Sequence, residues 1–279
     1  MKRTLMGLVL VAIIGLLAGC AGGGEGGGKT VLTFPHVLNA EHPVHKAIVK
    51  FAEEVATRSG GTMEIKIFEG GTMGSEQELV DNVAIGTNDM TKVSSTILEN
   101  KTELAKVYTL PYLFRDEEHM WKVLDGEVGR ELLDMAIDKG LKGVCYYDAG
   151  FRSFYTKDGF VDHPDKLTGQ KIRVQKSPMM EKLISTLGAS PQAIAFSELY
   201  SALDTGVVDG AENNIPSYYT TQHYKVAGYY TYDEHVAVPD IVLINSGTWN
   251  QLTPEQQKIL MDSAAASSKF QRDLWKKVI

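Results

Sequence analysis

The stretch TVLTFPHVLNAEHPVHKAIVKFAEEVATRSGGTMEIKIF (residues 30–68) decides the fold class. Thr30 to Phe34 has the pattern of a strand, and Pro43 to Arg58 predicts a helix with its apolar residues on one face. Ser59-Gly60-Gly61 ends that helix, and Met63 to Phe68 alternates as a half-buried strand. A strand, a helix and a second strand in close succession indicate an α/β protein.

The same alternation continues along the rest of the chain. Ser75-Glu76-Gln77-Glu78 is a capping box that starts a helix, and Gly86 ends it. Further strands are predicted over residues 89–93, 141–147, 153–157, 171–174, 193–196 and 240–245, and further helices over 117–124, 128–139, 179–187, 198–205 and from 254 onward. The pattern favours an α/β fold with mostly parallel strand pairing.

The N-terminus has the pattern of an export signal. A basic start precedes an apolar run from Leu5 to Ala18, which is too short for a membrane span. The run ends in Leu17-Ala18-Gly19-Cys20, which resembles the bacterial lipobox. We therefore expect residues 1–19 to be a signal peptide and Cys20 to become a lipidated first residue, with the glycine-rich residues 20–29 as a flexible tether. An ordinary signal peptide with an incidental cysteine, or a single anchor helix, would give a similar pattern.

Composition and charge exclude several classes of function. The net charge of −7 disfavours nucleic acid and anionic lipid surfaces as partners. Residues 23–30 match G-x-x-x-x-G-K-T, but no strand precedes them and no helix follows, so we expect no nucleotide site. His42 and His45 have no matched third ligand, so we expect no metal. Cys145 has no partner once Cys20 is lipidated, so we expect no disulfide.

Two arginines, Arg152 and Arg173, stand at positions suited to an anion. Arg173 ends a predicted parallel strand, and ligands of open α/β sheets gather beyond the carboxyl ends of strands. Arg152 follows Gly150 on a predicted turn. The guanidinium group offers a planar fork of donors that matches a carboxylate in two-point contact. The pair therefore suggests a site for a small organic acid, although either arginine could instead pair with an internal Asp or Glu.

Three further polar residues are candidates for the same site. Asn213 follows a predicted strand and offers both a donor and an acceptor to a hydroxylated ligand, although a turn-forming Asn would look the same. Glu76 could accept hydrogen bonds from ligand hydroxyls or simply complement the helix dipole. His36 follows the first strand. No carboxylate pair or nucleophile motif stands out, so the sequence indicates binding rather than catalysis.

Taken together, several segments resemble the DctP-type solute-binding proteins of tripartite ATP-independent periplasmic (TRAP) transporters. The segments run in family order: Asn39-Ala40-Glu41-His42-Pro43-Val44, Leu110-Pro111-Tyr112-Leu113-Phe114, Lys171-Ile172-Arg173-Val174, Gly188-Ala189-Ser190-Pro191, Phe196-Ser197-Glu198-Leu199-Tyr200 and Val208-Asp209-Gly210-Ala211-Glu212-Asn213. Residues 148–156 and 209–219 are similar to the subgroup that binds hexuronates such as glucuronate or galacturonate.

The resemblance implies a two-lobe fold like that of periplasmic binding proteins, often called a Venus flytrap, with a ligand cleft between the lobes. Residues 30–149 and 240–279 would form the first lobe, including a long C-terminal helix, and residues 150–239 the second. Family members usually continue beyond this point with elements that complete the second lobe, so either the sequence is truncated or the protein is unusually short.

The resemblance also implies roles for the candidate residues. Arg173 would hold the ligand carboxylate, with Arg152 as a second arginine near it. Asn213 would supply a cleft amide and Glu76 a hydroxyl acceptor, while the match for His36 is looser. The partner would be a TRAP membrane permease, driven by an ion gradient, and no cofactor is implied.

Several functions stay open on this basis. The ligand could also be a C4-dicarboxylate, sialic acid or another aldonic or keto acid. An exported, lipid-anchored enzyme acting on acidic sugars would need a catalytic carboxylate pair or metal that the sequence does not single out. A sensor-linked binding module would share the cleft but have a receptor as its partner.

Overall fold

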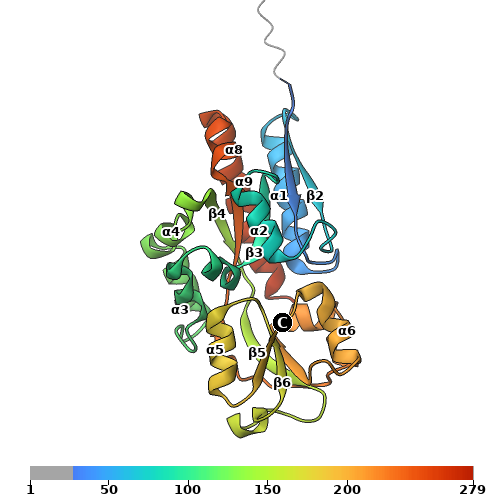
Figure 1. Ribbon diagram of the computed structural model, residues 1–279. Helices are drawn as coiled ribbons and strands as arrows, with labels where there is room; N and C mark the ends of the chain where they lie inside the picture. The colour runs from blue at the N-terminus through green and yellow to red at the C-terminus, as the bar shows by residue number, and fades with distance from the viewer. Residues whose placement is uncertain (1–27, 279) are drawn as a thin grey trace, which may run out of the picture.

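The computed structural model describes residues 28–278, which form three β-sheets with helices packed around them (Figure 1). In the first sheet β1 (Thr30–Pro35) runs parallel to β2 (Met63–Phe68). The helix α1 (Pro43–Arg58) connects the two strands and buries its apolar face in the main core. The strand, helix and strand predicted for this stretch are therefore confirmed.

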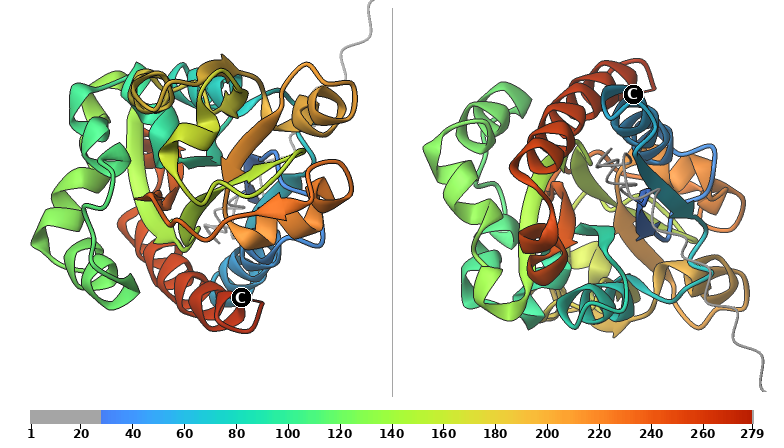
Figure 2. Two further views of the ribbon diagram at one scale, coloured as in Figure 1. Left: turned by 90° about the horizontal axis from the view of Figure 1, so that it is seen from below. Right: turned by 90° about the horizontal axis from the view of Figure 1, so that it is seen from above.

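The second sheet is antiparallel, in the order β3-β11-β4. Its strands are β3 (Met90–Ser94), β4 (Leu141–Tyr147) and β11 (Asp240–Asn245). The helix α2 (Glu76–Ala84) leads into β3 and begins with the predicted capping box. The long helix α9 (Pro254–Trp275) lies beside α1 in both Figures 1 and 2. These elements form the first lobe.

The third sheet belongs to the second lobe, below the first in Figure 1. Its strands, in the order β10-β5-β8-β6-β7 with β9 also paired to β5, are β10 (Val236–Ala237), β5 (Phe151–Thr156), β8 (Gly210–Asn213), β6 (Lys171–Val174), β7 (Ser190–Ala193) and β9 (Tyr229–Tyr230). The helices that follow these strands are α5 (Pro178–Thr186), α6 (Leu199–Asp204) and α7 (Ile215–Thr220).

The remaining elements cover the edges. The helices α3 (Glu117–Leu124) and α4 (Glu127–Leu133) pack beside β4, and α8 (Ser246–Gln251) leads into α9. Short 3-10 helices occupy Ser95–Asn100, Glu103–Thr109, Ile137–Lys139, Pro164–Leu167, Phe196–Glu198 and His223–Lys225.

The chain passes between the lobes at two neighbouring points. The first crossing joins Tyr147 to Phe151, and the second joins Ala237 to Asp240. The two crossings lie side by side because Ala237 pairs with Phe151 across β10 and β5. Gly150 at the first crossing has φ of 59°, and a Cβ there would lie 3.2 Å from Trp275 Nε1, so glycine is needed at this position. Closely spaced crossings of this kind allow two lobes to move as rigid bodies.

Three local predictions were wrong, for identifiable reasons. Mostly parallel pairing was predicted, but five of the eight strand pairs in residues 28–278 are antiparallel. The chain passes from one sheet to another and pairs strands that are far apart in the sequence. The strand predicted over 193–196 is instead Ser190–Ala193, since Phe196 begins a 3-10 turn. The helix predicted over 128–139 ends at Leu133, where Asp134 leaves helical geometry.

The predicted signal peptide over residues 1–19 and Cys20 lie outside the described residues.

Candidate functional site

Two connected cavities lie between the lobes. One has a volume of about 30 Å³ and is lined by polar side chains from both lobes, among them Glu76, Lys92, Asp240, Arg152, Gln175 and Asn213. The other, of about 90 Å³, adjoins it because Glu76, Gln175 and Phe196 line both, and it contains Arg173. The smaller cavity has room for only roughly two water molecules. The walls of the two lobes therefore lie close together here.

Arg173 lies at the wall of the second lobe with an incompletely used guanidinium group. Its neighbours in β6, Ile172 and Val174, enter the lobe core, so the strand alternation turns Arg173 to the opposite face. Its Nε donates to the Ile194 carbonyl oxygen at 2.9 Å. The side chain is 3 % exposed, and its buried Nη1 has no hydrogen-bond partner within residues 28–278. Burial lowers the pKa of Arg173, and the charge of Arg152 acts in the same direction.

Arg152 differs from Arg173 because it is paired inside the protein. Its Nε and Nη2 donate to the carboxylate of fully buried Glu212, and Nη2 also donates to the Glu212 carbonyl oxygen at 2.7 Å. Burial alone would raise the pKa of Glu212, but Arg152 and His235 outweigh it and hold that pKa at about 2. The structure thus places Arg152 at the cavity wall while an internal carboxylate neutralises its charge.

Asn213 ends β8 beside this pair. Its Oδ1 accepts from Arg152 Nη1 at 3.0 Å and from the Asn214 backbone N–H at 2.9 Å. The carbonyl side of the amide is therefore held by the protein. Its Nδ2 makes no hydrogen bond within the described part of the chain, and Asn213 lines the smaller cavity, so this donor remains for a ligand.

Glu76 faces the arginines from the first lobe. Its Oε1 accepts from Lys92 Nζ and from the Ser94 backbone N–H, both at 3.2 Å. Lys92 Nζ also lies 2.8 Å from Asp240 Oδ2. Burial would lower the pKa of Lys92, but the two carboxylates outweigh it and raise that pKa. Burial raises the pKa of Asp240, while Lys92 opposes the shift.

Lys92 and Asp240 were missed at the level of sequence. Lys92 stands in the fully buried strand β3, and Asp240 begins the fully buried strand β11. The sequence feature that could have indicated each residue was a single charged side chain in a predicted buried strand. The two residues meet only because β3 and β11 are neighbours in the sheet, which the sequence pattern did not show.

His36 lies apart from this group. It is fully buried, its Nδ1 accepts from the Leu38 backbone N–H at 3.2 Å, and its Nε2 lies 3.2 Å from His45 Nδ1. Burial, with help from Lys92, lowers the pKa of His36 to about 3. It lines neither interlobe cavity, whereas His42 lines the smaller one.

Direct hydrogen bonds join the lobes on one side of the cavities. Gln175 Oε1, from the second lobe, accepts from Thr96 Oγ1 at 2.9 Å and from Ser94 Oγ at 3.3 Å. Asn100 Nδ2 donates to the Lys176 carbonyl oxygen at 2.8 Å. These contacts describe a closed arrangement of the two lobes.

Similar contacts close the opposite side. His42 Nε2 lies 3.2 Å from Ser217 Oγ, and Asn39 Nδ2 donates to the Thr220 carbonyl oxygen at 3.1 Å. Burial lowers the pKa of His42 well below its usual value, with Lys92 adding to the effect, so its ring is neutral at physiological pH. The lobes therefore meet through direct hydrogen bonds, to which the Met179 backbone N–H adds one to the Glu99 carboxylate at 3.1 Å.

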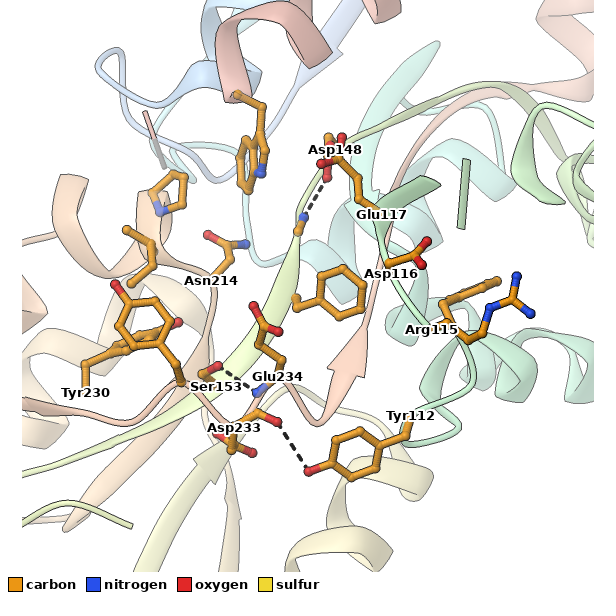
Figure 3. A pocket seen from close by; sticks show the side chains of 17 residues that line it. Tyr112, Arg115, Asp116, Glu117, Asp148, Ser153, Asn214, Tyr230, Asp233 and Glu234 are labelled. Carbon is orange, nitrogen blue, oxygen red and sulfur yellow. Dashed lines mark hydrogen bonds between the residues drawn. The ribbon is translucent and has the colours of Figure 1, made fainter. Parts of the chain in front are cut away.

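A larger hollow of about 440 Å³ is lined by residues of both lobes near the crossing at Gly150 (Figure 3) and shares Asn214 with the smaller cavity. Five carboxylates line it, against a single arginine, Arg115: Asp116, Glu117, Asp148, Asp233 and Glu234. Burial raises the pKa of Asp148 to about 6. An organic anion would meet repulsion in this hollow, so the two cavities beside Arg152 and Arg173 are the better candidate for an acid.

Neither a cluster of metal-ligating side chains nor a membrane-spanning helix is present within residues 28–278. No three His, Cys, Asp or Glu side chains in this range gather closely enough to hold a metal ion. No helix in this range combines the length and apolar character needed to cross a membrane.

Comparison with known proteins decides the family. Residues 34–278 match the family model described as bacterial extracellular solute-binding protein, family 7, or DctP. The chain belongs to this family. The resemblance to DctP-type proteins and the two-lobe fold are thereby confirmed, and the protein is a TRAP solute-binding protein.

Solved structures of relatives contain sugar acids. The family 7 protein is 33% identical to a TRAP periplasmic solute-binding protein from Sulfitobacter sp. NAS-14.1 with bound β-D-galacturonate, at a TM-score of 0.87, covering 89% of this chain and 83% of that one. It is 37% identical to one from Roseobacter denitrificans with bound β-D-glucuronate, at a TM-score of 0.86, covering 88% and 82%.

A relative with a different ligand is nearly as similar. The C4-dicarboxylate-binding protein of Bacillus subtilis is 32% identical over 242 residues, covering 87% of this chain and 69% of the relative. Identity alone therefore does not separate uronates from dicarboxylates, and the side chains of the cleft have to be considered.

Proposed function

We propose that this family 7 protein captures a hexuronate, such as D-glucuronate or D-galacturonate, between its lobes and delivers it to a TRAP permease. The observation that carries the proposal is Arg173, which lines an interlobe cavity and whose buried Nη1 has no hydrogen-bond partner within residues 28–278. A buried donor without a partner is costly unless a ligand supplies one. The bound uronates of the Sulfitobacter and Roseobacter relatives support the choice of acid.

The carboxylate binds at Arg173 in this proposal. The Ile194 carbonyl oxygen fixes Nε, so the guanidinium plane is already oriented before the ligand arrives. A carboxylate that accepts from the Arg173 nitrogens that Ile194 does not engage would form a charge-assisted contact worth about 1.5–3 kcal/mol. Arg152 has a different role, because Glu212 already neutralises its charge: its Nη1 donates to the side-chain Oδ1 of Asn213 and so orients that amide.

The sugar hydroxyls are then bound by polar groups on both walls. Asn213 Nδ2 donates from the second lobe, and the Glu76 carboxylate accepts from the first. His36 is assigned no direct contact, because it packs against His45 and lines neither cavity, while His42 takes the place at the wall. A ligand that contacts both walls favours the closed state.

Entry of a sugar requires the lobes to separate, since the present cavities are small. Rotation about the crossings near Gly150 and Asp240 would open the cleft, and ligand contacts with both lobes would close it again. The closed form would dock on the permease, with an ion gradient rather than ATP driving uptake. We place the protein outside the cytoplasm, as the family description indicates, with Cys20 as the site of a lipid anchor.

Substitution of the arginine tests the proposal. Arg173→Lys keeps the charge but loses the fork, so we expect hexuronate affinity to fall by roughly tenfold or more. Arg58→Lys, on the exposed surface of α1, is the matched control and should retain wild-type affinity. Titration calorimetry with D-glucuronate and D-galacturonate makes the measurement. Unchanged affinity in Arg173→Lys would defeat the assignment.

A further inference from the structure

The wall of the cavity formed by the first lobe carries an unbalanced negative charge. Glu76, Lys92 and Asp240 meet there, with Lys92 Nζ 3.2 Å from Glu76 Oε1 and 2.8 Å from Asp240 Oδ2. Two carboxylates and one ammonium group leave a formal charge of −1. All three side chains line the smaller interlobe cavity.

This charge is poorly screened. The side chains of Lys92 and Asp240 are 3% and 6% exposed, and that of Glu76 is 11% exposed. Salt and water screen buried charges much less than surface charges. The Lys92 ammonium group is also already engaged by two carboxylates, so it is not available to an incoming anion without giving one of them up.

The opposite wall has the reverse sign. Arg152 is neutralised by Glu212, whereas Arg173 has no counter-charge within the described residues, and exposed Lys176 lines the same cavity from the second lobe. The site is therefore polarised, with a positive group on one lobe and a net negative cluster on the other. Such a field favours one orientation of a ligand that carries a charge at one end only.

We propose that the Glu76–Lys92–Asp240 cluster selects against a second carboxylate. Given the proposed function, on which this inference rests, a hexuronate directs its carboxylate to Arg173 and its uncharged, hydroxylated end to the cluster. A ligand with carboxylates at both ends brings the second one against the negative wall. The cluster therefore separates sugar monoacids from aldarates and C4-dicarboxylates, a distinction that sequence identity with relatives does not make.

A matched ligand pair tests the selectivity. D-glucuronate is a pyranose with one carboxylate and D-glucarate is an open chain with a second carboxylate at C1, so the change of their ratio in the variants isolates the effect of charge. We expect calorimetry of the wild-type protein to give a dissociation constant for glucarate roughly tenfold or more above that for glucuronate, because like charges brought together in a poorly screened site repel. Asp240→Asn removes one negative charge and should reduce this ratio by roughly tenfold.

Two further variants keep the test decisive. Glu76→Gln removes the other carboxylate from a more exposed position, so it reports on the ratio even if Asp240→Asn folds poorly. Asp81→Asn, which removes a carboxylate on the outer surface of α2, is the control and should leave the ratio unchanged. The comparison uses ratios of dissociation constants, so a uniform change in affinity does not affect it.

The contradicting outcomes are distinct. Equal binding of both acids by the wild-type protein, or a ratio that neither cluster variant moves, would overturn this inference and leave the proposed function standing. Tighter binding of glucarate would show that Lys92 receives a second carboxylate, and would overturn it too. Failure of every sugar acid to bind would overturn the proposed function and this inference together.

Discussion

At the scale of single residues, the two arginines chosen from the sequence occupy different chemical states. Arg152 is held by Glu212 and Asn213, whereas Arg173 lines a cavity, donates to a backbone carbonyl and has a buried nitrogen without a partner in residues 28–278. Both stand in similar local sequence, flanked by strand formers. The difference arises from Glu212, whose contact with Arg152 depends on the pairing of β5 with β8.

The Arg152–Glu212 pair should be a strong determinant of stability. Glu212→Gln leaves a buried guanidinium without its counter-charge, which costs about 3–5 kcal/mol. We expect a clear loss of unfolding free energy at pH 7 in chemical denaturation. Glu54→Gln, which breaks the surface pair with Arg58, is the control and should cost about 0–1 kcal/mol. Equal stability losses in the two variants would contradict this account.

The same pair predicts a pH dependence. The pKa of Glu212 falls from its usual 4.5 to about 2 in the folded protein, so its contribution is complete above pH 4.5 and is lost as the pH falls toward 2. The stability difference between the wild-type protein and Glu212→Gln should therefore shrink as the pH is lowered through this window. A difference that stays constant between pH 5 and pH 2.5 would count against an ionised Glu212.

At the scale of elements, helices and strands with strong local patterns were predictable. The amphipathic pattern of α1, the capping box of α2 and the apolar run of β11 each act within a few residues. Strand pairing was not predictable in the same way, because the return of the chain at Asp240 inserts β11 between β3 and β4. The positions of Arg173 and Asn213 followed from their strands, but the meeting of Lys92 with Asp240 required the sheet order.

The segment that follows β6 also makes hydrogen bonds between the lobes. Gln175 accepts from Thr96 and Ser94 of the first lobe. Gln175→Ala removes these contacts, so the closed state should be less populated and hexuronate affinity should fall by roughly threefold to tenfold. Calorimetry measures the affinity, and small-angle scattering of the unliganded variant should show a larger radius of gyration. Gln170→Ala, which removes a hydrogen bond within the second lobe, is the control; an equal effect there would refute the role of Gln175.

At the scale of the whole molecule, the cleft places opposite charges on the two lobes. The cation lies at Arg173 in the second lobe, and the negative cluster lies in the first, so a ligand with one carboxylate and several hydroxyls fits both walls. The acidic hollow in Figure 3 is larger, but its charge is unsuited to an acid. We therefore propose that the sign of the charge on the wall, more than the size of the hollow, decides where the ligand binds.

The most direct measurement is a crystal structure of the protein with D-glucuronate. We predict that the sugar carboxylate makes a two-point contact with the Arg173 guanidinium, between lobes closed around it, and that the far hydroxyls lie near Glu76. A carboxylate bound elsewhere, with Arg173 bonded to protein groups alone, would contradict it.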